Sequence, residues 1–299
     1  MTSRKQNSKA QGQEPEQGAG NTVQLTQTEE REVKKRAGLR PEVVFETVRR
    51  EGERELERSI PALAFSALAA GLSMGFSLVL PGLLHSMLPD APWRPLIENI
   101  GYTAGFVIVV LGRQQLFTEN TVTAILPLLD DRGKLRTLQK VLRLWCIVLA
   151  GNLIGAAIFA FAVAHSSIFE PNVKAAFLQI GTQALAPGFW TVILRGIFAG
   201  WLIALMVWLL PEASTQKLFV ILLITYLVGV CGLSHIIAGS VETLYAVAAG
   251  AASWGTYFAH YLVPVFIGNV IGGVLLVSLL NYGQVAPEPD ERVKDADKS

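Results

Sequence analysis

The chain alternates between long apolar runs and short polar segments, and this pattern predicts elements that cross a membrane. A membrane-crossing helix needs roughly 20 consecutive apolar residues. Four runs have about that length, at residues 60–84, 141–164, 188–210 and 261–280. Two further runs, 97–129 and 218–252, are too long for one straight crossing, and polar or glycine-rich sequence interrupts each near its middle. We therefore predict an all-α membrane protein of six transmembrane helices, in which helices 2 and 5 are broken.

Two parts of the chain match each other across an offset of 117 residues. The sequence GNLIG at 151–155 recurs as GNVIG at 268–272, and the same offset carries Thr118 onto His235. Because each copy holds three crossings, an odd number, the two copies must enter the membrane from opposite faces. The predicted architecture is an inverted three-plus-three repeat. A polar interruption at corresponding places in two such repeats indicates a substrate path near the bilayer midplane.

Charge is concentrated at the two ends of the chain. Residues 1–59 carry twelve Lys or Arg and eleven Asp or Glu, without the apolar core and small-residue cleavage site of a secretory signal. Basic residues follow the second span, whereas few lie on the opposite side, so both termini are expected to be cytoplasmic. The predicted domains are a disordered N-terminal tail at 1–40, a charged cytoplasmic helix at 41–59, a six-span membrane domain at 60–281 and a C-terminal tail at 282–299.

Composition excludes several classes of protein. With 51% hydrophobic and 16% charged residues, so unevenly spread, the chain is not built as a soluble globular domain. Its net charge of +1 gives no reason to expect nucleic acid as a partner. Cys146 and Cys231 both lie inside apolar runs, where two thiols offer neither a disulfide framework nor a zinc site. We expect no metal and no cofactor.

The candidate functional residues lie at the breaks in the two over-long runs. A broken membrane helix frees N–H and C=O groups that lipid cannot satisfy, so it persists only where protein buries it or where it lines a wet cavity. Half-helices that begin at such breaks direct partially positive N-termini inward, which favours an anion. The side chains beside the breaks are apolar and are candidate pore walls: Tyr102, Phe106, Leu116, Phe117, Ile203 and Val228.

Thr118 and His235 form the candidate central site. Moving a bare ion into an apolar constriction is unfavourable by several kcal/mol, and desolvation raises the pKa of a carboxylate by up to about 3–5 units. A weak acid that enters as the anion would therefore take up a proton if a donor stood nearby. An ionisable side chain in the middle of an apolar run usually marks a transport path. We predict that His235 is the proton donor, because its unperturbed pKa is near 6.5.

Asn152 and Asn269 lie between paired glycines at equivalent positions of the two repeats. Glycines four residues apart let helix backbones approach closely. An amide in apolar surroundings must find hydrogen-bond partners. Each asparagine is therefore expected to tie the third helix of its repeat to the broken helix beside it.

Five motifs occur in a fixed order: GRQQLFTEN at 112–120, GNLIGA at 151–156, RGIFAGWLIALMVW at 195–208, GLSHIIA at 232–238 and PVFIGNVIGG at 264–273. In these motifs the chain resembles the formate/nitrite transporter family, bacterial channels for small monovalent anions, over about residues 60–281; the first is similar to the family's G-x-E-L-F-T-G-N. The resemblance implies an aquaporin-like six-helix protomer, a homopentamer with one pore per subunit, and a place in the bacterial inner membrane.

The resemblance also assigns roles to residues. It implies that Thr118 and His235 occupy the centre of the pore, between two apolar constrictions. The periplasmic constriction would be formed by Tyr102, Phe106 and Val228. The cytoplasmic constriction would be formed by Leu116, Phe117 and Ile203.

The chain departs from the family pattern around the pore. The loop glutamate of the family is Gln115 here, the acidic residue expected before the central histidine is Ser234, and the asparagine expected in the fourth helix is Gly200. The vestibule lysine is also missing. Arg113 and Glu119 are additions, and one expectation is that they pair across the loop. The candidate loop and packing residues are Gln115, Glu119, Asn120, Asn152 and Asn269.

The function that these residues favour is a channel or transporter for small monovalent weak-acid anions such as formate or nitrite, with hydrosulfide or acetate as further candidates. Two alternatives share the architecture. One is a pore for small neutral solutes, although the paired Asn-Pro-Ala turns of such pores are absent; the other is a closed structural membrane protein. An intramembrane enzyme is not expected, because the adjacent Ser234 and His235 would point about 100 degrees apart on a helix, without a third orienting group.

Overall fold

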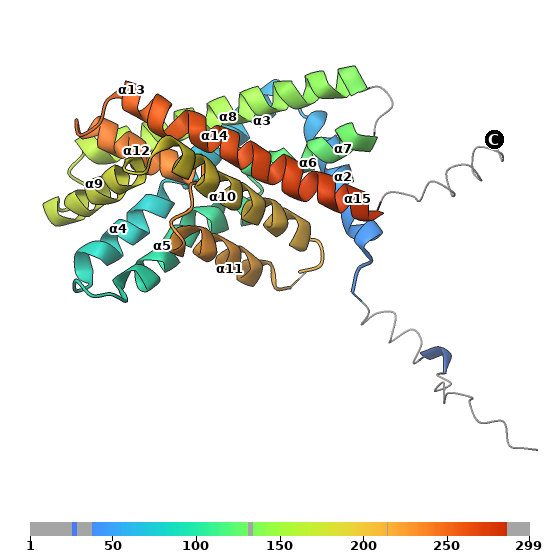
Figure 1. Ribbon diagram of the computed structural model, residues 1–299, viewed down its shortest axis with the longest axis horizontal. Coiled ribbons are helices and arrows are strands. Elements are labelled where there is room, and N and C mark those ends of the chain that lie inside the picture. The colour runs from blue at the N-terminus through green and yellow to red at the C-terminus, as the bar shows by residue number, and fades with distance from the viewer. Residues whose placement is uncertain (1–25, 29–37, 131–133, 214, 286–299) are drawn as a thin grey trace, which may run out of the picture. The chain divides into compact units, whose positions relative to one another are not determined.

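The computed structural model describes residues 26–28, 38–130, 134–213 and 215–285, and within these ranges it contains helices and no strand (Figure 1). The predicted all-α class is thereby confirmed. The chain divides into two compact units, residues 1–38 and 39–299. In the first unit, residues 27–28 are helical. The rest of the predicted N-terminal tail up to residue 37, and the predicted C-terminal tail beyond Val285, lie outside the described residues.

The second unit consists of helices of very different lengths. Their bounds are α2 Pro41–Leu56, α3 Ile60–Ser73, α4 Phe76–Met87, α5 Arg94–Leu111, α6 Phe117–Thr123, α7 Ile125–Asp130, α8 Lys134–His165, α9 Pro171–Leu185, α10 Phe189–Leu209, α11 Lys217–Val230, α12 Ala238–Ala248, α13 Trp254–Thr256, α14 Val263–Val270 and α15 Leu280–Val285. Two more widely wound π-helical segments, η1 Tyr257–Leu262 and η2 Ile271–Leu279, connect the last three of these helices.

Five helical stretches among the described residues are long and apolar enough to cross a membrane. They are Ile60–Met87, Arg94–Leu111, Lys134–His165, Phe189–Leu209 and Trp254–Val285. Helix α11 is apolar but has only 14 residues. The five stretches overlap five of the six predicted runs with shifted ends: α8 begins before residue 141, and the last stretch continues past the predicted domain boundary at residue 281. The sixth run, 218–252, contains α11 and α12.

The backbone leaves the helical conformation inside both over-long runs. Helix α5 ends at Leu111 and α6 begins at Phe117, whereas α11 ends at Val230 and α12 begins at Ala238. We call residues 112–116 loop 1 and residues 231–237 loop 2. Both loops follow an apolar helix and lead into a short helix whose side chains are nearly all buried.

Helix α9 was missed by the sequence analysis, which left residues 171–185 in a connection. Pro171 stands at its first position, where the missing N–H is harmless. Val173, Phe177 and Gly181 are buried at helical spacing, and the helix packs on α12 and α4. The stripe is short and polar residues flank it, which is why hydropathy alone did not single it out.

Two helix pairs pack closely, α3 with α8 and α10 with α14. Gly155 of α8 lies against the backbone of Leu68, and Gly272 of η2 lies against the backbone of Ile197, so that neither position has room for a Cβ atom. Glycine is therefore required at both crossings, because any side chain would push the helices apart.

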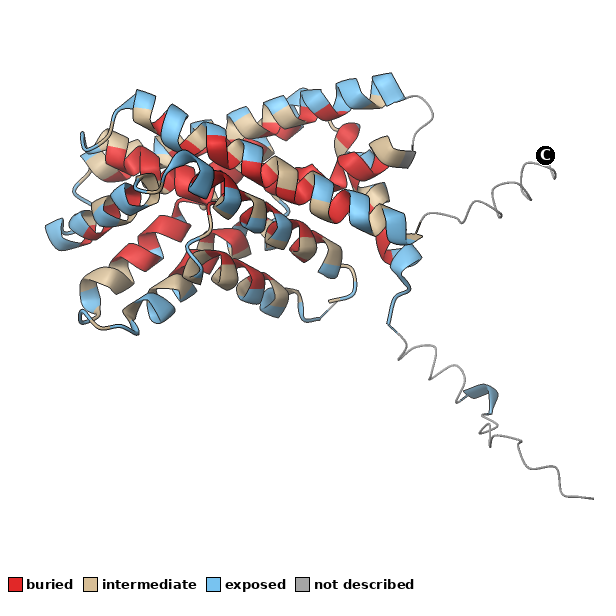
Figure 2. Ribbon diagram, in the orientation of Figure 1, coloured by how far each residue is buried: buried red, intermediate tan, exposed pale blue. Residues whose placement is uncertain are grey.

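Buried residues gather along the middle of the helical bundle, and exposed residues cover its outer faces and ends (Figure 2). The outer faces are themselves strongly apolar: Phe65 and Trp190 are each 75% exposed and Phe219 is 65% exposed. A soluble monomer rarely exposes so many large apolar side chains. Such a surface is suited to contact with lipid.

Helix α2 is not a free lead-in helix. Its Phe45 and Val48 are buried in an apolar cluster with Val122 and Leu126 from α6 and α7 and Val277 from η2. The apolar face of this charged helix therefore packs against α6, α7 and η2.

Candidate functional site

Both loops begin with the same backbone motif. Arg113 has φ 50° and Gly232 has φ 61°, so both residues adopt the left-handed conformation. In each loop, the N–H of the following residue bonds a carbonyl oxygen of the preceding helix at 3.0 Å. This is a Schellman-type helix ending, which glycine adopts freely and which a residue with a side chain adopts at a cost of roughly 1–2 kcal/mol.

Asn152 of α8 ties loop 1 to two other helices. Its Oδ1 accepts a hydrogen bond from the backbone N–H of Phe117 at 2.9 Å. Its Nδ2 donates to the carbonyl oxygens of Gln115 at 2.9 Å and Ala67 at 2.8 Å. The amide therefore holds the start of α6 and the side of α3 at the same time, and its burial is matched by three hydrogen bonds.

Asn269 of α14 makes the corresponding contacts for loop 2. Its Oδ1 accepts from the N–H of Ile236 at 2.9 Å, and its Nδ2 donates to the carbonyl oxygens of Ser234 and Gly196, each at 2.9 Å. The two loops are thus held by the same set of three hydrogen bonds, from the same residue type.

These contacts correct the register between the two halves. The backbone N–H of Phe117 bonds Asn152, and the backbone N–H of Ile236 bonds Asn269, so Phe117 and Ile236 are equivalent residues of the two halves. Phe117 and Ile236 are 119 residues apart, whereas the two asparagines are 117 residues apart. The chain from the bonded N–H to its asparagine spans 35 residues in the first half and 33 in the second. Thr118 and His235 therefore do not occupy equivalent positions, even though the sequence match pairs them.

The side chains of Thr118 and His235 nevertheless meet. Thr118 Oγ1 lies 2.8 Å from His235 Nε2. The other ring nitrogen, Nδ1, accepts the backbone N–H groups of Ile237 and Ala238 at 3.3 and 3.2 Å. Because a backbone N–H can only donate, Nδ1 carries no hydrogen, and the neutral ring carries its hydrogen on Nε2. Thr118 Oγ1 is therefore the acceptor of the 2.8 Å bond.

Aromatic and aliphatic side chains enclose this pair. The rings of Phe106 and His235 meet edge to face with centroids 4.8 Å apart, and Tyr102 lies 5.5 Å from Phe106 by the same measure. Thr118 is 0% exposed and His235 is 1% exposed. The remaining predicted constriction residues are also fully buried: Leu116, Phe117, Ile203 and Val228. In this conformation the pair is enclosed by packed side chains.

Two further residues support the site, and the sequence analysis missed both. Tyr261 donates its hydroxyl hydrogen to the carbonyl oxygen of His235 at 3.0 Å. Trp145 donates its indole N–H to the carbonyl oxygen of Asn120 at 3.1 Å. Both lie in apolar runs, and the only signal in the sequence is that a buried tyrosine or tryptophan needs a partner for its polar atom.

The polar residues of loop 1 and α6 bind one another and a carboxylate from α2. Gln115 Nε2 donates to Glu55 Oε1 at 3.1 Å, and Gln115 Oε1 accepts from Asn120 Nδ2 at 3.0 Å. Thr123 Oγ1 donates to Glu55 Oε2 at 2.6 Å. Burial raises the pKa of Glu55 above its ordinary value, and the hydrogen bonds from Thr123 and Gln115 offset only part of that effect. Nothing in the sequence pattern of the charged helix distinguishes Glu55 from its acidic neighbours.

Arg113 and Glu119 do not form the pair that the sequence left open. Arg113 is exposed, and Oε1 of Glu119 is buried without a hydrogen-bond partner among the described residues. The expectation of a loop ion pair was wrong, because the left-handed turn at Arg113 leaves its side chain in an exposed position while α6 carries Glu119 inward.

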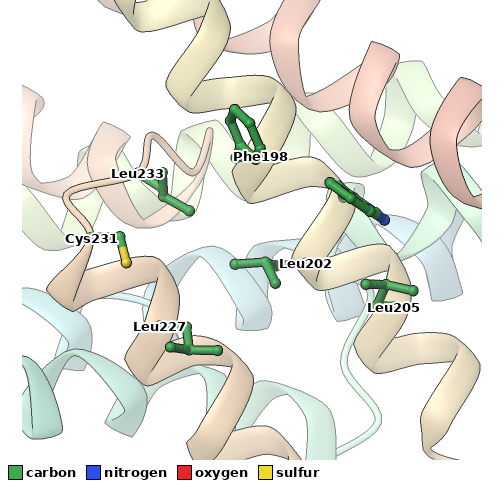
Figure 3. Close-up of a pocket in the computed structure, with 7 residues that line it drawn as sticks. Phe198, Leu202, Leu205, Leu227, Cys231 and Leu233 are labelled. Carbon is green, nitrogen blue, oxygen red and sulfur yellow. The ribbon is translucent and has the colours of Figure 1, made fainter.

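An apolar hollow of about 460 Å³ lies between α10 and α11 (Figure 3). Its lining residues are Phe198, Trp201, Leu202, Leu205, Leu227, Cys231 and Leu233. Cys231 and Leu233 belong to loop 2, so the hollow borders that loop. Neither Thr118 nor His235 lines this hollow, and its apolar side chains do not suit the binding of an anion.

The chemistry available at the pair is hydrogen bonding to one small solute. With Thr118 Oγ1 accepting from the ring, the hydroxyl hydrogen of Thr118 is left to donate to a further partner. Among the described residues, no group of three or more His, Cys, Asp or Glu side chains is arranged to hold a metal ion.

Comparison with known sequences gives a consistent result. A family model described as formate/nitrite transporter matches residues 42–283. The inner membrane protein YfdC of Escherichia coli strain K12 is 40% identical over 251 residues, which cover 84% of this chain and 81% of that protein. The formate channel BtFdhC of Bacillus thuringiensis is 28% identical over 251 residues, covering 81% and 94% respectively.

Solved structures share the fold. A structure described as an FNT family ion channel has a TM-score of 0.69 at 18% identity and covers 82% of this chain and 99% of its own. A pentameric formate channel with formate bound has a TM-score of 0.64 at 21% identity, with coverage of 76% and 98%. At these identities the likeness is one of fold.

Proposed function

This chain belongs to the formate/nitrite transporter family, and on that premise we propose that it is a membrane channel or transporter for small monovalent weak-acid anions such as formate or nitrite. The observation that carries the proposal is the hydrogen bond between Thr118 and His235, which joins the two halves of the chain inside an apolar enclosure. Because family members are channels and transporters, we propose no enzymatic activity.

The proposed architecture has six crossings in two inverted sets of three. Helices α5 and α6 count as one broken crossing, and α11 and α12 count as another. Three observations support this: the matched left-handed turns of the two loops, the matched contacts of Asn152 and Asn269, and the paired packing of α3 with α8 and α10 with α14. The fold likeness to channel structures agrees with it.

We place the binding step for the anion at Thr118. An anion that has lost its water needs a hydrogen-bond donor, and hydrogen bonds to charged groups contribute about 1.5–3 kcal/mol each. The hydroxyl hydrogen of Thr118 is free for this purpose, because the ring of His235 already donates to Thr118 Oγ1. The bond from the ring polarises the hydroxyl and strengthens its donation.

The proton-donating role proposed for His235 requires a second conformation. A ring that gives up a proton must first hold two, and the second would sit on Nδ1. That nitrogen faces the N–H groups of Ile237 and Ala238, which are themselves donors. Proton delivery therefore requires the ring to turn away from the start of α12, whereas the neutral ring acts by hydrogen bonding alone.

Conduction also requires the enclosure to open. The proposed periplasmic constriction comprises Tyr102, Phe106 and Val228, and the proposed cytoplasmic one comprises Leu116, Phe117 and Ile203. All six are buried, which supports a closed conformation. In the proposed mechanism, side chains such as Phe106 move aside for a solute to pass.

We further propose a homopentamer in the bacterial inner membrane, with lipid as its surrounding and both termini in the cytoplasm. The relative at 40% identity is described as an inner membrane protein, and one solved structure of the same fold is a pentameric formate channel. The exposed apolar side chains on the outer faces supply the surface that lipid or a second subunit would cover.

The test is flux into liposomes that contain the purified protein. Formate, nitrite, hydrosulfide, acetate and glycerol are offered separately over a range of pH. Thr118→Val is expected to lower anion flux roughly 10- to 100-fold, the equivalent of one charged hydrogen bond. His235→Asn is expected to lower it as well, with a loss of its pH dependence.

Thr243→Val is the matched control. Thr243 is equally buried, and its hydroxyl donates within α12 to the carbonyl oxygen of Gly239 at 2.7 Å. This control should conduct like the wild type. Glycerol flux in place of anion flux would favour a neutral-solute pore, and the absence of any flux would favour a closed structural protein; either result defeats the proposal.

A further inference from the structure

Helix α2 lies directly against the end of α6 at Gly52 and Glu55. A Cβ atom at Gly52 would collide with the carbonyl group of Thr123, at the end of α6. The carboxylate of Glu55, one helical turn later, binds the side chain of the same threonine. Arg143 of α8 fixes the end of α2 by donating to the carbonyl oxygen of Leu56 at 2.6 Å. The carboxylate is therefore held in place by both backbone and side-chain contacts.

The two oxygens of Glu55 bind the two ends of one polar chain. Oε2 accepts from Thr123 at 2.6 Å, and Oε1 accepts from the amide of Gln115 at 3.1 Å. Gln115 in turn accepts from Asn120 Nδ2 at 3.0 Å, and its backbone oxygen accepts from Asn152 at 2.9 Å. One carboxylate thus joins the segment before α6 to the last turn of α6, and α6 is the helix that carries the central threonine.

We propose that Glu55 is a positioning residue for Thr118, because it fixes loop 1 and the end of α6 through Gln115 and Thr123. The carboxyl group of Glu55 accepts a hydrogen bond from Gln115 through Oε1. Its presence forces Nε2 of Gln115 to point towards α2 and Oε1 to point towards Asn120, so the amide has one allowed orientation. The contacts stand by themselves, whereas the effect on transport rests on the proposed function.

The hydrogen bond between Glu55 and Gln115 predicts a specific result for each substitution at these two positions. Glu55→Gln leaves one acceptor oxygen where there were two. If that oxygen accepts from Gln115, the new amide NH2 faces the hydroxyl of Thr123, which must then accept a hydrogen bond where it donated one. Gln115→Glu places two carboxylates together, close to Glu119, where like charges repel. Each single change therefore disturbs the polar chain, Glu55→Gln by reversing the bond with Thr123 and Gln115→Glu by placing two carboxylates together.

The double exchange restores it. In E55Q/Q115E, the new carboxylate at position 115 accepts from the amide at position 55 and from Asn120. The carbonyl oxygen of that amide accepts from Thr123. Every donor of the original chain again has an acceptor, and the volumes of the two side chains are unchanged. A purely bulky or helix-stabilising role for Glu55 would show no such reciprocity.

The experiment is a double-mutant cycle with two readouts. Formate and nitrite flux is measured in liposomes, and amide hydrogen exchange is measured over residues 112–123, for wild type, E55Q, Q115E and E55Q/Q115E. We expect each single variant to lower flux about tenfold, as for one buried hydrogen bond lost, and to speed exchange in that segment. The double variant should return to within about threefold of wild type in both readouts, which is within the scatter of such hydrogen-bond effects.

Glu57→Gln is the matched control. Glu57 follows the same helix but is exposed and pairs with Lys140 at 3.2 Å, a contact that contributes little. This variant should match wild type in both readouts.

Two results would overturn the positioning role. One is a double variant that stays as impaired as the worse single variant, and the other is single variants that leave both flux and exchange unchanged. If wild type carries neither anion, the proposed function fails by itself; the exchange cycle over residues 112–123 then decides whether Glu55 positions the loop.

Discussion

Replacing Asn152 with alanine removes three hydrogen bonds from one buried point. The N–H of Phe117 loses its acceptor, and the carbonyl oxygens of Gln115 and Ala67 lose their donor. These groups belong to loop 1, α6 and α3, so the change removes one hydrogen bond between α8 and each of three elements. No other side chain in the described structure makes this set of contacts to loop 1.

The size of the effect follows from the number of bonds. In soluble proteins, a buried polar group left without a partner costs about 1–3 kcal/mol. Between membrane helices, measured hydrogen bonds average about 0.6 and reach about 1.7 kcal/mol, because the unfolded chain in the membrane also finds partners. Three bonds on the membrane scale give roughly 2–5 kcal/mol. Asn269→Ala removes the matching three bonds at loop 2 and should fall in the same range.

The assay is reversible unfolding of the purified protein in mixed micelles, with hydrogen exchange over residues 115–117 as a local probe. Asn99→Ala is the control, because the hydrogen bond that the amide of Asn99 donates stays within its own helix, to the carbonyl oxygen of Pro95 at 2.8 Å. That control should change the free energy of unfolding by less than about 0.5 kcal/mol, as expected for a change away from buried contacts.

The reasoning would be refuted by a loss below about 1 kcal/mol for Asn152→Ala. It would also be refuted if the two asparagines differed strongly, for example if Asn152→Ala were severe and Asn269→Ala neutral. In that case the two sets of hydrogen bonds would contribute different free energies, and the two loops could not be treated as equivalent.

Three further predictions concern α2 and the loops. Burial raises the pKa of Glu55 above the ordinary value of 4.5, so folding favours the protonated carboxyl group. The contribution of Glu55 to the free energy of unfolding is therefore full below about pH 4.5 and is lost as the pH rises through the pKa of the folded state. The melting temperature of wild type should therefore fall relative to that of E55Q between pH 4.5 and neutral pH; a relative rise would contradict this. Gly232→Ala should destabilise the protein by about 1–2 kcal/mol in thermal unfolding, because φ 61° is unfavourable for a residue with a Cβ atom. Arg113→Gly should leave stability unchanged or raise it by up to about 1 kcal/mol, and equal losses for both would argue against backbone strain as the cause.

The positions of the apolar helices could be predicted from hydropathy, since lipid demands long apolar runs that are visible in sequence without any knowledge of contacts. The interruption of the two over-long runs at loop 1 and loop 2 was also visible, because polar and glycine residues mark it. Helix α9 was not, since its buried stripe of Val173, Phe177 and Gly181 is short and is covered by other helices rather than by lipid.

The candidate site was only partly accessible to the same reasoning. The two residues of the central pair were named, but their equivalence was inferred from an alignment fixed by the glycine and asparagine motifs. Those motifs are held by helix packing at a spacing of 117 residues, whereas the loops follow hydrogen bonds that set a spacing of 119. Connections of different length, 35 and 33 residues, absorb the difference. No pattern within one chain reports such a slip.

The sequence by itself determined an all-helical membrane protein, the places where its helices are interrupted and the two side chains that meet, Thr118 and His235. These features are visible in sequence because burial in lipid and the free-energy cost of unpaired backbone groups both depend on local composition. Only the tertiary structure decided which ring nitrogen of His235 carries the hydrogen, which asparagine contacts hold each loop, and that a carboxylate from α2 stands beside Gln115, where the family pattern has one in the loop itself. Glu55 looks in sequence like any exposed acidic residue of a charged helix. Its role depends on an approach between segments 60 residues apart, which is set by the fit of Gly52 against α6 and not by anything local to either segment.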